Sequence, residues 1–170
     1  MSLHADLLAQ AKSLALLEKG KPKQASLRRA VSCAYYSLFH LLVGEGAALL
    51  GSKLSKDARA KLQRSFMHAD MKTVCMSYTQ PQARFNAQIA PLLGFPLQPE
   101  LVALAGLFVL LQEERHSADY DVAAVFNRAD VLTLVEDLTI ARGGWSTVRT
   151  SDNAKVFLAD LLLRKSWSRQ

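Results

Sequence analysis

The sequence predicts an all-α protein, an up-and-down bundle of four to five helices with an extra helix at its C-terminal end. Apolar residues recur at the spacing of helices, about 3.6 residues per turn, and no stretch alternates apolar and polar residues for long. Only eight glycines and five prolines occur in 170 residues, which argues against a loop-rich all-β design. We therefore expect one domain, with the bundle over residues 1–142 and an addition over residues 143–170.

Six helices are expected, and the residues between them explain where each begins and ends. Their ranges are about residues 2–19, 23–50, 56–78, 99–117, 127–142 and 152–165. Gly20-Lys21-Pro22 ends the first helix, because glycine frees the backbone and proline cannot continue the hydrogen-bond ladder. Gly51 closes the second helix, and Ser52 or Ser55 caps the third.

A long connection precedes the last three expected helices. Four prolines, at positions 81, 91, 96 and 99, predict an irregular segment over residues 79–98 with one short helix near residues 82–90. Pro99 suits the first turn of the fourth helix, and Asn127 can cap the fifth. The pair Gly143-Gly144 is expected to loosen or end the fifth helix, and an amphipathic helix then finishes the chain.

Composition limits the partners and the location of the protein. A net charge of +6 makes the chain moderately basic, which permits contact with nucleic acid or another acidic partner. The longest apolar run, residues 101–111, is shorter than the roughly 20 residues that span a bilayer, so no membrane partner is expected. Cys33 and Cys75 lie in helical patterns and no secretory signal is evident, so we expect reduced thiols in a cytoplasmic protein.

The second expected helix carries an unusual side. One side is apolar throughout, and the opposite side holds Arg29, Cys33, Tyr36, His40 and Val43. A surface helix would place lysine and glutamate there. Either Tyr36 and His40 are hydrogen-bonded in a second layer of core, or this side forms a subunit interface or lines a cleft.

A polar cluster, Arg115 to Tyr120, ends the apolar fourth helix. A charge carried to the rim of a core needs a partner or a cleft. Asp119 lies four residues after Arg115, the spacing at which helical residues form ion pairs. Either this pair closes the end of the bundle, or Arg115 binds a phosphate, whose oxygens suit the fork of a guanidinium.

A basic stripe is expected on the third helix. Its members recur at helical spacing and have Lys53 and Lys56 nearby: they are Lys61, Arg64, His68 and Lys72. Such a stripe is either the solvated face of a surface helix or a contact for the RNA backbone.

Several chemistries have no motif in the sequence. It contains no glycine-rich phosphate loop, no cysteine or histidine pair with zinc spacing, and no nucleophile elbow. The four histidines, at positions 4, 40, 68 and 116, are scattered. No metal site and no cofactor are therefore expected.

Two segments together resemble the HEPN superfamily of small helical domains. Residues 29–40, R-A-V-S-C-A-Y-Y-S-L-F-H, are similar to the double-tyrosine helix of one branch, and residues 115–121, R-H-S-A-D-Y-D, are similar to its R-x-x-A-D-Y-D segment. The resemblance implies a helical bundle, commonly a homodimer with a cleft near the dimer axis. It also implies RNA cleavage or nucleotide binding, often in toxin–antitoxin or defence settings, where a nucleotidyltransferase-type protein is a possible partner.

The chain departs from the nuclease members of that family at one position. Those members carry an arginine, a polar residue, three further residues and a histidine. Here Arg115 and His116 match, but Tyr120 stands where the histidine belongs. A phenol titrates near pH 10 and is a poor general base at neutral pH.

The sequence therefore favours a dimeric module that binds RNA, a nucleotide or a partner protein. Arg115 would bind phosphate and be oriented by Asp119, while Tyr36, His40 and Tyr120 would line the cleft. A metal-independent ribonuclease is the first alternative, with His116 or His40 as its base and Arg115 stabilising the phosphorane. A structural adaptor whose last helix docks a partner is the second.

Overall fold

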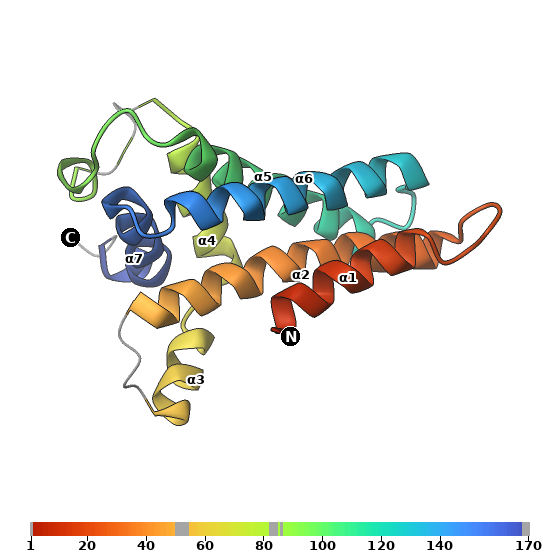
Figure 1. Cartoon of the computed structure of the whole chain (residues 1–170), viewed down its shortest axis with the longest axis horizontal. Coiled ribbons are helices and arrows are strands. Elements are labelled where there is room, and N and C mark those ends of the chain that lie inside the picture. The colour runs from red at the N-terminus through yellow and green to blue at the C-terminus, as the bar shows by residue number, and fades with distance from the viewer. Residues whose placement is uncertain (1, 50–54, 82–84, 86, 168–170) are drawn as a thin grey trace. The chain divides into compact units, whose positions relative to one another are not determined.

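The computed structural model describes residues 2–49, 55–81, 85 and 87–167 (Figure 1). All regular structure in these ranges is helical, so the predicted all-α fold class is confirmed. The α-helices are α1 (Leu3–Ala15), α2 (Gln24–Leu49), α3 (Lys56–Arg64), α4 (His68–Tyr78), α5 (Pro99–Tyr120), α6 (Arg128–Val148) and α7 (Asp152–Trp167). A 3-10 helix, η2, covers Ala90–Leu92. Within the described ranges, no helix has the length and apolar character needed to cross a membrane.

The chain forms two compact units. The first unit comprises Met1–Leu41 and Leu107–Gly143, and the second comprises Leu42–Gly106 and Gly144–Gln170. Helices α2, α5 and α6 each contribute residues to both units. The C-terminal residues, expected as an addition to the bundle, thus group with the middle of the chain.

The first unit packs α1 against parts of α2, α5 and α6. Its buried core includes one small and tightly packed group: Ala15, Leu27, Ala30, Val31, Ala118 and Val131. Arg128, at the start of α6, donates to the carbonyl oxygens of Ala15 at 3.1 Å and Gly20 at 2.8 Å. These bonds satisfy carbonyl groups at and beyond the end of α1, where the helix itself supplies no partners.

Aromatic packing between α4 and α7 organises the second unit. The rings of Tyr78 and Phe157 lie 4.8 Å apart, and Trp145, from the end of α6, lies 6.2 Å from Phe157. Asn153 ties the segment before α5 to α7 by donating to Gly94 O at 2.7 Å and accepting from Gly94 N at 2.8 Å. The C-terminal helix α7 therefore packs into the aromatic core of the second unit.

The expected third helix is wrong as a single element. Residues 65–67 leave the helical conformation between α3 and α4, and Phe66 between them is only 4% exposed. A Cβ atom placed on Gly46 of α2 would lie 2.6 Å from the Phe66 ring, so the aromatic ring occupies the space that the glycine leaves. Burial of this ring explains why the chain turns there.

The expected end of the fifth helix is also wrong. Helix α6 continues through Gly143 and Gly144 to Val148. A Cβ atom on Gly144 would lie 3.1 Å from Glu100 Cγ, so the glycine permits a close approach to the start of α5. The predicted cap is confirmed, because Asn127 Oδ1 accepts from Asp130 N at 2.9 Å. Part of the short helix expected near residues 82–90 lies outside the described residues.

Candidate functional site

The predicted ion pair is present at the end of α5. Arg115 Nε lies 2.7 Å from Asp119 Oδ2, and both side chains are 20% exposed. The other carboxylate oxygen, Oδ1, accepts a hydrogen bond from Ser32 Oγ of α2 at 2.7 Å. Asp119 therefore holds the guanidinium and is itself held by a neighbouring helix.

Tyrosine rings surround the Arg115 guanidinium. Its Nη2 donates to Tyr36 Oη at 3.2 Å. Its central carbon lies 5.9 Å from the ring centroid of Tyr35, 5.6 Å from that of Tyr36 and 5.4 Å from that of Tyr120. These distances allow cation–π attraction, which is stronger at a partly desolvated site. Burial acts to lower the pKa of Arg115, but Tyr36 and Asp119 outweigh it and raise this pKa, so the charge is retained.

Both candidate histidines border these tyrosines. The His40 ring lies 6.3 Å from the Tyr36 ring, and the His116 ring lies 5.1 Å from the Tyr120 ring. Burial lowers the pKa of His40, which favours a neutral imidazole. The five side chains form a continuous series, called here the Arg115 row: His40, Tyr36, Arg115, Tyr120 and His116.

The two ends of the Arg115 row differ in their exposure to solvent. Tyr120 is 64% exposed, and His116 beside it is exposed. Tyr36 and His40 are half-buried. Each imidazole neighbours a tyrosine ring that itself neighbours the guanidinium. The row can therefore bind a planar or anionic group at its exposed end.

Two contributors to the row were missed from the sequence. Ser32 holds Asp119, and Tyr35 packs under the guanidinium while its ring lies 5.6 Å from Phe108 in the core. Ser32 precedes Tyr36 by four residues, so helical spacing alone would have placed both on one face. Tyr35 is buried whereas Tyr36 is half-buried, because successive residues on a helix point about 100° apart.

The predicted basic stripe does not lie on one helix. Lys61 and Arg64 belong to α3, whereas His68 and Lys72 belong to α4, after the break at residues 65–67. Their regular spacing therefore does not place them on a single helical face, and that expectation is wrong. Lys53 lies outside the described residues. All four stripe residues belong to the second unit, whereas the Arg115 row belongs to the first.

Cysteine and acidic residues show no metal-binding arrangement where the structure describes them. No group of three or more histidine, cysteine, aspartate or glutamate side chains in those ranges could hold a metal ion. Cys33 is half-buried in α2 and Cys75 is buried in α4, and both are free thiols in the structure.

The two motifs noted in the sequence meet in the Arg115 row. The first lies in α2 and supplies Tyr36 and His40, and the second ends α5 and supplies Arg115, His116 and Tyr120. Comparison of the chain with protein-family models, curated proteins and solved structures gives no match. The geometry of the row and the two motifs are therefore the basis for a functional proposal.

Proposed function

We propose that the chain is a HEPN-like helical module that binds single-stranded RNA or a nucleotide at the Arg115 row without cleaving it. The main support is the arrangement of a held guanidinium beside an exposed aromatic pair. Tyr120 contacts Arg115 on one side and His116 on the other. A base stacked on this pair would bring its phosphate towards the guanidinium.

The chemistry of the row suits nucleotide binding. Aromatic side chains stack on every base, and each stacked base contributes about 1–3 kcal/mol. The guanidinium fork suits phosphate oxygens, and Asp119 and Tyr36 already orient it. Because those contacts exist before the ligand arrives, binding needs little ordering of the arginine side chain.

Binding is favoured over cleavage for a chemical reason. Metal-independent cleavage needs a general base and a group that stabilises the developing charge at the same phosphate. Tyr120 occupies the position of the family's histidine, and the ring that each imidazole neighbours is a tyrosine, a poor general base at neutral pH. The ribonuclease alternative would need His116 to reorient.

The proposed homodimer and partner protein rest on the family resemblance. It implies a homodimer and, in a toxin–antitoxin setting, a nucleotidyltransferase-type partner protein. Sedimentation of the purified chain at micromolar concentration tests the dimer. A monomer at that concentration would contradict this part and leave the RNA-binding proposal to be judged separately.

Substitutions at Tyr120 test RNA binding. Anisotropy of a fluorescein-labelled oligouridine at low salt should show binding to the parent chain. Tyr120→Ala should weaken that binding about 5- to 150-fold, the equivalent of one stacked base, whereas Tyr120→Phe should retain it. Val122→Ala is the control, since Val122 follows α5 and is 96% exposed.

The same samples separate the alternatives. Absence of binding by the parent at low salt would contradict the proposal and favour the adaptor. Equal binding by Tyr120→Ala and the parent would place the RNA elsewhere, for example on the basic residues of α3 and α4. Cleavage of the oligouridine in the presence of a chelator, lost in His116→Ala, would establish the ribonuclease instead.

A further inference from the structure

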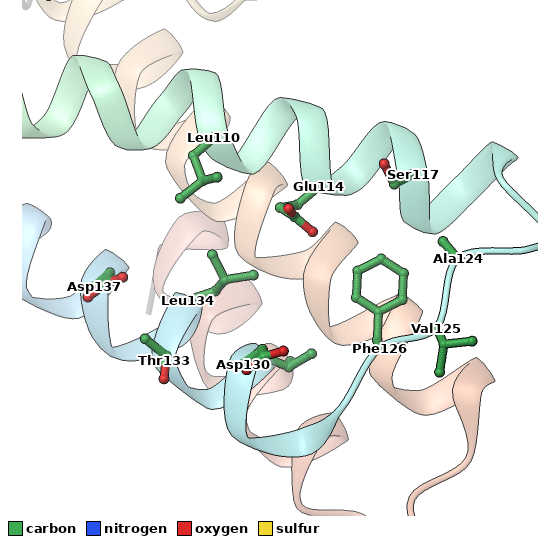
Figure 2. Close-up of a pocket in the computed structure, with 11 residues that line it drawn as sticks. Leu110, Glu114, Ser117, Ala124, Val125, Phe126, Asp130, Thr133, Leu134 and Asp137 are labelled. Atoms are coloured by element: carbon green, nitrogen blue, oxygen red, sulfur yellow. The ribbon is translucent and has the colours of Figure 1, made fainter.

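A groove opens between α5 and α6 of the first unit, on a different side of α5 from Arg115. Its volume is about 620 Å³. Leu110, Val125 and Leu134 supply apolar surface, and Glu114, Asp130 and Asp137 supply carboxylates. Figure 2 shows Leu110 and Glu114 projecting from α5 towards the side of α6 that carries Leu134 and Asp130. We call this feature the acidic groove.

The end of the acidic groove is held in place by α2. Arg28 donates to the carbonyl oxygens of Ala118 at 2.9 Å, Asp121 at 2.9 Å and Ala124 at 2.6 Å. Gln24 bonds both backbone groups of Phe126, at 2.7 and 2.9 Å. These contacts fasten the connection between α5 and α6, so the groove is formed before any partner binds.

The charge of the groove is opposite to that of the chain. Three carboxylates and no lysine or arginine line it, although the chain as a whole has a net charge of +6. Such a local reversal of charge attracts a cationic partner. Asp130 also accepts from Asn127 Nδ2, which leaves Glu114 and Asp137 as the principal carboxylates for a partner.

The apolar part of the groove argues for more than a simple cation. Leu110 is 41% exposed and Val125, at the end of the groove, is 82% exposed. The lining runs from Leu110 to Ser117 on α5 and from Asp130 to Asp137 on α6. Each stretch covers two helical turns, about 10 Å. A groove of this length that combines apolar and acidic side chains is complementary to two turns of a basic amphipathic helix.

We infer that the acidic groove docks a short basic amphipathic helix of a partner protein. Apolar side chains at positions i and i+4 of that helix would lie on Leu110 and Leu134. Lysine or arginine side chains beside them would pair with Glu114 and Asp137. This site is independent of the proposed RNA site, because the two sets of residues lie on different sides of α5.

A synthetic peptide tests the docking site on the full chain. The probe is a fluorescein-labelled peptide of about 14 residues with leucines at i and i+4 and lysines beside them, and its control has glutamates in place of the lysines. The parent should bind the basic peptide with micromolar affinity and the acidic peptide at least about tenfold more weakly. Chemical shifts should change at residues 110–117 and 130–137.

Matched substitutions on both helices examine charge and shape separately. Glu114→Gln with Asp137→Asn should weaken peptide binding at least about tenfold, whereas Glu113→Gln with Glu136→Gln, the exposed neighbours, should change it less than about twofold. Leu110→Ala should also weaken binding, whereas Ile140→Ala, at a residue that is 64% exposed on α6, should not. Tyr120→Ala should bind the peptide as the parent does.

Each opposite result would overturn the inference. Equal binding by the parent and the Glu114→Gln, Asp137→Asn chain would exclude the groove. An affinity for the basic peptide that Leu110→Ala leaves unchanged would mean that the peptide binds only by non-specific attraction between charges. Self-association of the parent that the same two substitutions abolish would identify a second copy as the occupant. Melting curves confirm that each variant is folded.

Discussion

Asp160 is a buried carboxylic acid whose charge opposes folding. It lies in α7, is 2% exposed, and its Oδ1 has no hydrogen-bond partner within the described residues. Burial raises its pKa from 3.8 to about 6, although Arg164 acts in the opposite direction. Its charge also contributes to raising the pKa values of Cys75 and Tyr78, behind burial, so the carboxyl group faces α4.

The sign and size of the effect follow from the two pKa values. Because the folded pKa is the higher one, the folded state binds the proton more tightly. The protein is therefore most stable, with respect to this group, below about pH 3.8, where Asp160 is protonated. That stability is lost as the pH rises through about 6 and the buried carboxyl group ionises. At about 1.4 kcal/mol for each pKa unit, the full loss is about 3 kcal/mol.

Replacement of Asp160 by asparagine removes this titration. The difference in the free energy of unfolding between Asp160→Asn and the parent should shift in favour of the variant by about 1.4 kcal/mol between pH 5 and pH 8. Urea denaturation at several pH values measures it. Comparing the change with pH cancels any constant effect of placing an amide in the buried site.

Asp152→Asn is the control for Asp160→Asn. Asp152 lies at the start of the same helix with a side chain that is 93% exposed. Its difference from the parent should stay constant between pH 5 and pH 8, because this side chain lies in solvent and not in the buried site of Asp160. A difference for Asp160→Asn that is equally constant would refute the assignment of a raised pKa to this buried carboxyl.

Two further predictions concern packing and the ion pair. Gly46→Ala should destabilise the chain by about 1–3 kcal/mol, because its Cβ would lie 2.6 Å from the Phe66 ring, and adding Phe66→Leu should recover part of that loss in urea denaturation. Simple additivity of the two losses would show that the ring and the glycine are not in contact. Arg115→Ala should lower the free energy of unfolding by about 2 kcal/mol, between the values for exposed and buried pairs, because Asp119 keeps its bond from Ser32. A loss below about 0.5 kcal/mol in thermal melts would mean that the pair is solvated.

Local features of the sequence were sufficient to predict the all-α class, the cap at Asn127 and the pairing of Arg115 with Asp119. Each depends on residues within about one helical turn, so helical periodicity and capping chemistry encode it directly. The same holds for the start of α5 at Pro99. The two motifs of the Arg115 row could be recognised because each is local in the sequence. Their proximity in the folded chain could only be expected.

Tertiary contacts alone decided the remaining features. The break between α3 and α4 depends on Phe66 meeting Gly46, and the continuation of α6 depends on Gly144 meeting Glu100. Ser32 reaches Asp119, and Arg28 fastens the end of the acidic groove, through bonds that join residues far apart in the sequence. No local pattern encodes such pairs, because packing between distant segments outweighs the modest helix preferences of single residues.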